Sequence, residues 1–208
     1  MNTERVRPFS LRRYVLIMLL CYAGWVTLYY TTAWIGASRG PVFDPSLPID
    51  ATFPIVPWTF FIYLLAYVIV LGLFVIRRNA QFLNLAFSSF IVMNLGAFAL
   101  FALFPAQGPE RDFAAEGGGV IALVHLVDSR FNAFPSLHVA NPWLVAFLSL
   151  KERGFSVPSM LFLLVAPAIS LSTMLVRQHY LLDVLGGFAL AVLTAAIVFP
   201  RKISSNPW

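Results

Sequence analysis

Six long apolar runs constrain the fold of this chain more than any other feature of its sequence. A run of about 20 apolar residues forms a helix that crosses a hydrocarbon core of roughly 30 Å. Apolar residues make up 60% and charged residues 11% of the 208 residues, against about 45–50% and about 25% in soluble domains. The sequence therefore predicts an all-α polytopic membrane protein, a six-transmembrane-helix bundle in which residues 1–208 form one domain. The predicted helices run over about Tyr14–Trp34, Trp58–Ile76, Gln81–Leu103, Ser136–Leu150, Val157–Val176 and His179–Phe199.

The first run follows four arginines, as the apolar part of a secretory signal peptide would. It is longer than the about 7–15 apolar residues of such a signal, so we expect an uncleaved first helix. Pro142 and Pro167 lie inside predicted helices, where neighbouring membrane helices satisfy the carbonyl groups that proline frees.

Basic residues lie beside the apolar runs and predict the topology. The formal net charge is +5, but these residues form no extended stripe that would bind nucleic acid. Ten of the 14 precede the first run or lie in the connections after the second, fourth and sixth runs. The positive-inside rule then places both termini in the cytoplasm. We expect a cytoplasmic (inner) membrane protein with outward loops at residues 35–57, 104–135 and around 177.

Several ionisable residues are predicted to meet on the outward side. Such residues at a membrane are costly and therefore indicate function. Arg111 lies in the long second loop, His138 near the start of the fourth helix, and Arg177, His179 and Asp183 near the start of the sixth. Three separate stretches of chain thus converge on one side of the membrane.

The segment Phe134-Pro135-Ser136-Leu137-His138 is typical of a helix start, with Ser136 as the N-cap. The first turn then points free N–H groups and a partial positive charge outward, which suits a phosphate group. An ordinary capped helix with an interfacial histidine is the alternative interpretation. The fourth helix has only about 15 residues, or roughly 22 Å, so its outer end is expected to be sunk near the lipid headgroups. This position favours a lipid substrate.

His179 and Asp183 are four positions apart and share one helix face. A carboxylate that accepts a hydrogen bond from one imidazole nitrogen makes the other nitrogen more basic, and so a candidate nucleophile. Alternatively, the pair only neutralises itself, and Arg177 is a snorkelling anchor.

The two histidine segments resemble motifs of the type 2 phosphatidic acid phosphatase (PAP2) superfamily. Residues 134–138 resemble its Pro-Ser-Gly-His motif, and Ser172 to Asp183 is similar to its Ser-Arg-x5-His-x3-Asp motif. The resemblance covers about half of the chain, with the motifs within residues 104–187. It implies a six-helix core, no metal and no cofactor, a phosphohistidine formed on His179 with Asp183 orienting it, and His138 as the general acid.

Some family positions differ in this chain. The Lys-x6-Arg-Pro motif is not intact, because Phe104 stands at the lysine position and Asp112 follows Arg111. Leu137 replaces the motif glycine, and Thr173 replaces an arginine. We expect Arg111, Ser136, Leu137 and Arg177 to hold the phosphate in their place. The altered segments look like the branch that includes inositol phosphorylceramide synthases.

The expected function is hydrolysis of a phosphorylated membrane lipid, a phosphoric monoester or diphosphate, at the outer face of the membrane. One alternative is a phospho-headgroup transferase, in which an alcohol replaces water. Another is a haem electron carrier with His138 and His179 as axial ligands, and a third is a catalytically inactive scaffold or transporter. His125 matches no family motif, and the glycines at residues 117–119 are a flexible connection or a hinge.

Overall fold

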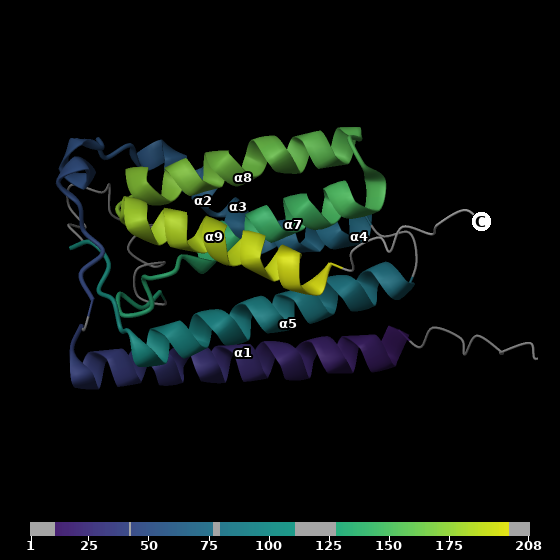
Figure 1. The fold of residues 1–208 in the computed structure, drawn as a ribbon, viewed down its shortest axis with the longest axis horizontal. Coiled ribbons are helices and arrows are strands. Elements are labelled where there is room, and N and C mark those ends of the chain that lie inside the picture. The colour runs from purple at the N-terminus through teal and green to yellow at the C-terminus, as the bar shows by residue number, and fades with distance from the viewer. Residues whose placement is uncertain (1–10, 42, 77–79, 111–127, 200–208) are drawn as a thin grey trace, which may run out of the picture.

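The computed structural model describes residues 11–41, 43–76, 80–110 and 128–199, and helices dominate this part of the chain. Two isolated β-bridges, which join Phe43 to Ala106 and Ala106 to Asn132, are the only strand-like pairings found there. Figure 1 shows the longer helices running roughly side by side. They are α1 (Leu11–Arg39), α5 (Ala80–Leu103), α7 (Leu137–Arg153), α8 (Val157–Leu175) and α9 (Leu181–Val198).

The second apolar run forms a series of short helical pieces instead of one helix. They are η2 (Pro57–Thr59), α2 (Phe60–Tyr63), α3 (Leu65–Val68), η3 (Ile69–Gly72) and α4 (Leu73–Ile76). The N–H of Tyr67 donates to the Leu64 carbonyl oxygen at 3.2 Å, the tighter spacing of a 3₁₀ turn. Gly72 admits the Phe162 ring of α8, which would lie 2.5 Å from a Cβ atom at that position. The broken segment therefore packs closely against α8 at Gly72, where its backbone is irregular.

Three helices of the described residues are long and apolar enough to cross a membrane, so the prediction of six such spans is wrong by that measure. They are Gln81–Leu103 in α5, Val157–Leu175 in α8 and Leu181–Val198 in α9. The run at 57–76 is interrupted, and α7 has only 17 residues and ends in charged side chains. In α1, the side chains of residues 11–15, 17 and 18 lie outside the described part. Three apolar helices still indicate a membrane protein.

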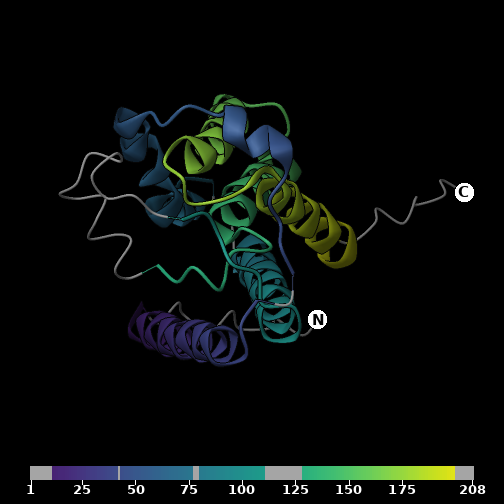
Figure 2. The same cartoon turned by 90° about the vertical axis from the view of Figure 1, so that its left-hand side faces the viewer.

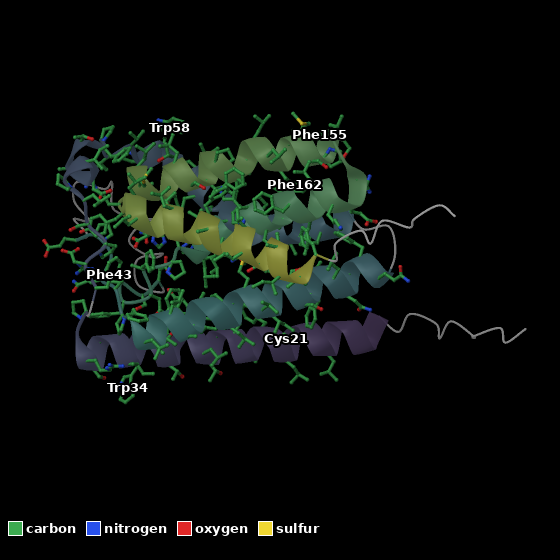
Figure 3. All side chains as sticks on the ribbon, viewed as in Figure 1. Cys21, Trp34, Phe43, Trp58, Phe155 and Phe162 are labelled. Atoms are coloured by element: carbon green, nitrogen blue, oxygen red, sulfur yellow. The ribbon has the colours of Figure 1, made fainter. Side chains whose placement is uncertain are left out.

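Helix α7 is the centre of the bundle and contacts α5, α8 and α9 as well as the broken segment. Its Leu144 and Leu148 side chains are fully buried. Helix α1 lies at the edge of the bundle and packs against α5, as Figure 2 shows. In Figure 3, side chains such as Trp34 on α1 point away from the bundle. Trp34 is 69% exposed, which suits a surface that faces lipid.

The described parts of the segments that join α1 to α2, α5 to α7 and α8 to α9 gather at one end of the bundle (Figure 1). Backbone bonds tie them together: the N–H of Phe43 donates to Pro105 at 3.3 Å, and the N–H of Gly108 donates to Arg130 at 2.8 Å. The described residues of the predicted outward loops therefore share one end, where the starts of α7 and α9 also lie.

Candidate active site

The start of α7 places His138 at this end of the bundle. Ser136 is the N-cap residue, as predicted, with extended backbone angles (φ −67°, ψ 115°). Its hydroxyl makes no capping hydrogen bond, contrary to our expectation. The N–H groups of Val139 and Ala140 both donate to the Ser136 carbonyl oxygen, at 3.3 and 3.0 Å. The Ser136 side-chain oxygen, Oγ, is buried and has no hydrogen-bond partner among the described residues.

The starts of α7 and α9 pack closely against each other. The backbone N–H of Ser136 donates to the Asp183 carbonyl oxygen at 3.0 Å. A Cβ atom on Gly187 would lie 2.3 Å from the Ser136 carbonyl oxygen and 3.0 Å from Val139 Cβ. Only glycine permits this approach. The contact fixes the segment that carries His138 relative to the segment that carries His179.

A tight turn between α8 and α9 positions His179. The turn contains Arg177 in the left-handed region, with φ 54°. The N–H groups of Gln178 and His179 both donate to the Thr173 carbonyl oxygen, at 2.9 and 3.2 Å. The chain thereby reverses just before α9, and the His179 side chain is directed back toward α7.

Asp183 holds the His179 ring from behind. Its Oδ2 accepts a hydrogen bond from the Tyr180 N–H at 2.9 Å and lies 3.4 Å from His179 Nδ1. Asp183 is fully buried, and His179 is 7% exposed. A carboxylate that accepts the Nδ1 proton leaves the Nε2 lone pair free to act as a base or nucleophile. The two side chains meet as expected, but not on one helix face, because α9 begins at Leu181 and His179 lies in the turn before it.

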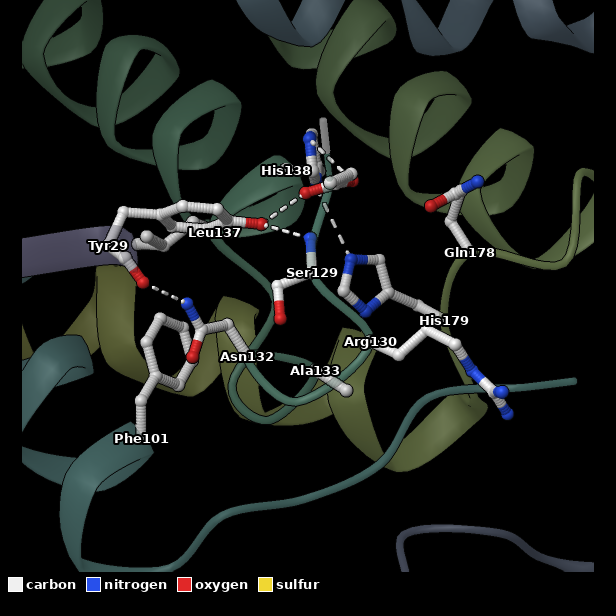
Figure 4. Close-up of a pocket in the computed structure, with 11 residues that line it drawn as sticks. Tyr29, Phe101, Ser129, Arg130, Asn132, Ala133, Leu137, His138, Gln178 and His179 are labelled. Carbon is white, nitrogen blue, oxygen red and sulfur yellow. Dashed lines mark hydrogen bonds and ion pairs between the residues drawn. The ribbon is translucent and has the colours of Figure 1, made fainter. Parts of the chain in front are cut away.

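His138 and His179 face each other across 3.3 Å, measured from His138 Nδ1 to His179 Nε2. Their ring centroids are 5.5 Å apart. Figure 4 shows both rings at a small cavity, whose volume of about 20 Å³ is enough for about one water molecule. Leu137, also a predicted site residue, lines the same cavity. The structure thus brings His138, His179 and Asp183 together.

Asp128 and two tyrosines complete the cluster on the other side of His138. Asp128 Oδ2 lies 3.7 Å from His138 Nε2 and accepts a hydrogen bond from the Tyr63 hydroxyl at 2.9 Å. The Tyr29 hydroxyl donates to Asp128 Oδ1. Neither Asp128 nor the two tyrosines is among the site residues predicted from the sequence. Tyrosine within an apolar run is ordinary in membrane proteins, so no sequence signal pointed to them.

Asp50 is a second buried carboxylate that sequence reasoning missed. It accepts hydrogen bonds from the N–H groups of Leu47 at 2.6 Å and Leu181 at 2.8 Å. It thereby ties the first outward loop to the start of α9. Burial raises the pKa of the neighbouring Tyr180 hydroxyl, and the negative charges of Asp44, Asp50 and Asp183 raise it further.

The arginines are arranged differently from the prediction. Arg177 does not line the cavity, because its guanidinium donates to the carbonyl oxygens of Asp50 at 3.4 Å and Phe53 at 3.2 Å. Arg130 does line it, donates to the Gly108 carbonyl oxygen at 3.4 Å, and has a buried Nε with no partner among the described residues. Arg111 and His125 lie outside the residues that the structure describes.

No group of three or more metal-ligating side chains occurs within the described ranges. The groups at the cavity are two facing imidazoles, a carboxylate next to each of them, a helix N-terminus and the side chain of Arg130. This combination suits the binding and transfer of a phosphoryl group.

A family model described as the PAP2 superfamily matches residues 54–197 of the chain. The chain belongs to the PAP2 superfamily. No curated protein and no solved structure matches it. PAP2 proteins are membrane-bound and generally comprise phosphatases and phosphotransferases. The matched region of this PAP2 protein contains His138, His179 and Asp183, together with Tyr63 and Asp128.

Proposed function

We propose that this PAP2 protein is a metal-independent lipid phosphatase that forms a phosphohistidine on His179. The direct approach of His138 and His179, with Asp183 behind the second ring, carries the proposal. Phosphoryl transfer requires in-line attack, positive charge around the equatorial oxygens and a proton for the departing oxygen. Each of these requirements has a candidate group at the cavity.

In the first step, His179 Nε2 attacks phosphorus while Asp183 holds the Nδ1 proton. The N–P bond forms, the bond between phosphorus and the lipid oxygen breaks, and His138 gives a proton to that oxygen. In the second step, His138 takes a proton from water, whose oxygen attacks phosphorus. The N–P bond breaks, inorganic phosphate leaves, and both histidines regain their first protonation states.

Substrate binding must separate the two rings. A reacting nitrogen and phosphorus are about 3 Å apart before attack, and a hydrogen bond to the leaving oxygen spans about 3 Å more. The two nitrogens therefore have to lie roughly 6 Å apart, against 3.3 Å in this structure. The bound phosphoryl group replaces the direct contact between the imidazoles and displaces the water that the cavity can hold.

Several groups are suited to bind the phosphate oxygens. The start of α7 supplies backbone N–H groups and the positive end of the helix dipole, at Leu137 and His138. The Ser136 hydroxyl is buried nearby without a partner among the described residues. Arg130 contributes a positive charge to the cavity lining, and we assign Arg111 to the same task from its place in the sequence. Arg177 has a structural role instead.

The depth of the site supports a lipid substrate. Helix α7 has 17 residues, or about 25 Å, which is shorter than a hydrocarbon core of roughly 30 Å. Its N-terminal end therefore lies near the headgroup level when Lys151 and Arg153 reach the opposite surface. The distribution of basic residues supports cytoplasmic termini and an active site on the outer face of the cytoplasmic membrane.

The same cavity supports transfer as well as hydrolysis. An alcohol in the place of water turns the second step into headgroup transfer, as in the inositol phosphorylceramide synthases that the motifs resemble. A bis-histidine haem is not supported, because axial ligands lie on opposite faces of a macrocycle. Here the two nitrogens contact each other directly beside a cavity of about 20 Å³.

A panel of phosphorylated lipids tests the proposal. The purified protein in lipid vesicles is given polyprenyl diphosphate, phosphatidate, phosphatidylglycerophosphate or a phosphosphingolipid, and both phosphate release and new headgroup products are measured. We expect release from at least one lipid and none from the His179→Ala protein. Headgroup exchange without release identifies a transferase. No product from any lipid, or equal activity of the His179→Ala protein, contradicts the proposal.

A further inference from the structure

A second carboxylate lies next to the imidazole that we assign as the acid. Asp128 and His138 are only 12% and 15% exposed, with Asp128 Oδ2 3.7 Å from His138 Nε2. The Tyr63 hydroxyl lies between them, 2.9 Å from Asp128 Oδ2 and 3.1 Å from His138 Nε2. Asp128 therefore relates to His138 much as Asp183 relates to His179.

Asp128 is held by groups from two helices. The Tyr29 hydroxyl of α1 donates to its Oδ1, and the Tyr63 hydroxyl of α2 donates to its Oδ2. The Tyr29 oxygen also accepts a hydrogen bond from the Ser129 N–H at 2.9 Å. Contacts with α1, α2 and the adjacent backbone thus set the position of the carboxylate. Tyr29 and Tyr63 precede Asp128 by 99 and 65 positions in the chain.

The contacts in this cluster allow an arrangement of protons that suits the mechanism. A phenol has one proton, and an ionised carboxylate only accepts hydrogen bonds. In this arrangement Tyr63 donates to Asp128, and both His138 Nε2 and the Tyr67 hydroxyl donate to the Tyr63 oxygen. His179 Nδ1 donates to Asp183, and one further proton is shared between His138 Nδ1 and His179 Nε2.

We propose that Asp128, held by Tyr29 and Tyr63, is a positioning residue that keeps His138 in the protonated form needed to release the lipid oxygen. This inference rests on the proposed phosphatase or transferase function. With the shared proton on His138, His179 Nε2 has a free lone pair for attack. Asp183 therefore supports the nucleophile, and Asp128 supports the acid.

The charged and titratable groups that face His138 come from several elements. Tyr63 and Tyr67 lie on α2 and α3, with ring centroids 4.9 and 5.2 Å from that of His138. Asp128 and Arg130 approach from the segment before α7, and His179 from the segment before α9. Asp128 is the carboxylate in contact with the outer side of the His138 ring. Without this carboxylate, protonated His138 is therefore expected to lose its proton more readily.

The test compares Asp128→Asn with Asp44→Asn, a matched change of an exposed carboxylate in an outward loop. Activity is measured on the lipid that the wild-type protein hydrolyses best. We expect Asp128→Asn to lower kcat about 10- to 100-fold with little change in KM. The alkaline limb of its kcat profile is expected to move about 1 pH unit lower, since a nearby negative charge favours an imidazolium. Asp128→Glu is expected to recover part of the rate.

A second substrate separates acid support from a structural role. Nitrophenolate departs from nitrophenyl phosphate without a proton, so the first step on this ester does not need the acid. In a single turnover, Asp128→Asn is expected to release nitrophenolate within about 3-fold of the wild-type rate while its lipid turnover is strongly reduced. Tyr63→Phe is expected to show the same pattern more weakly, and Tyr22→Phe, at an exposed position of α1, no loss.

The outcomes distinguish this inference from the proposed function. Equal loss on both substrates with an unmoved pH profile means that Asp128 has only a structural role, and overturns the inference. Activity of Asp128→Asn equal to that of Asp44→Asn also overturns it, while the proposed function stands. A wild-type protein that acts on none of the substrates contradicts the proposed function itself.

Discussion

His138 Nδ1 lies 3.3 Å from His179 Nε2, although the two residues are 41 positions apart in the chain. The contact depends on how the starts of α7 and α9 meet. The Ser136 N–H donates to the Asp183 carbonyl oxygen, and Gly187 allows the helices to approach. This contact joins Asp183, which lies behind the proposed nucleophile, to Ser136, the N-cap of the helix that carries the proposed acid.

Replacement of His179 by alanine is expected to abolish turnover, by at least about 10³-fold, because no other group can form the covalent intermediate. Incubation of the wild-type protein with a lipid carrying ³²P in its phosphate, followed by rapid denaturation, should trap an acid-labile phosphoprotein. The chain contains three histidines, so His125→Ala is a matched control, and we expect it to keep the activity. A phosphoprotein formed by the His179→Ala protein would place the covalent bond on another residue.

Vanadate is expected to inhibit, and metal chelators are expected to have no effect. Vanadate adopts the five-coordinate geometry of the phosphorus during attack, so it should bind between the two imidazoles and compete with the lipid. The mechanism assigns no step to a metal ion. Phosphate release is measured with increasing vanadate and, separately, after prolonged treatment with EDTA. Strong inhibition by EDTA that added divalent metal reverses would contradict the proposed histidine mechanism.

A methyl group at position 187 is expected to disturb both stability and activity. In Gly187→Ala the new Cβ would lie 2.3 Å from the Ser136 carbonyl oxygen, so α7 and α9 have to move apart. Such overpacking typically costs about 1–3 kcal/mol. Thermal unfolding in detergent should show a lower Tm, and kcat should fall because the two imidazoles no longer align. In the control Gly24→Ala, the added Cβ meets no atom within 4 Å, so Tm should be unchanged or higher. Equal Tm values for both variants would contradict the prediction, because α7 and α9 would then accommodate the added methyl group without loss of stability.

Hydropathy and motif spacing predict much of this molecule, because they report local properties of the chain. The helices at α5, α8 and α9 follow from apolar length. The contact of His179 with Asp183 was expected from helical spacing, but it forms at the N-terminal cap of α9, because His179 precedes that helix. Apolar length does not determine whether a run forms one regular helix, and the segment at residues 57–76 is broken. The six predicted spans therefore reduce to three that qualify by length and hydropathy.

The features that sequence reasoning missed depend on contacts between distant parts of the chain. Tyr63 and Asp128 meet across 65 positions, and no local pattern encodes that contact. Arg177 was expected at the phosphate in place of the family's cationic residues that this chain lacks. Its left-handed backbone, with φ 54°, accompanies a side chain that contacts the carbonyl oxygens of Asp50 and Phe53 instead. Spacing alone does not reveal such a turn.

Arg130 and Arg177 are expected to respond differently to replacement by alanine. Arg130 lines the cavity, so Arg130→Ala should raise KM for the lipid phosphate about 10-fold or more, since a charge-assisted hydrogen bond contributes about 1.5–3 kcal/mol. Arg177→Ala removes the donors to Asp50 and Phe53, so it should lower Tm and leave KM within about 2-fold, because this guanidinium does not touch the phosphate.

Steady-state kinetics and thermal unfolding of both proteins measure the difference between the two arginines. Arg39→Ala is a suitable control, since Arg39 is an exposed residue whose side chain donates to the Ala102 carbonyl oxygen, outside the cavity lining. Arg130→Lys should recover part of the affinity through its charge but not the planar donor geometry of arginine. A large rise in KM for Arg177→Ala, with a normal KM for Arg130→Ala, would show that Arg177 binds the phosphate instead of Arg130. The turn before His179 would then have to open when substrate binds.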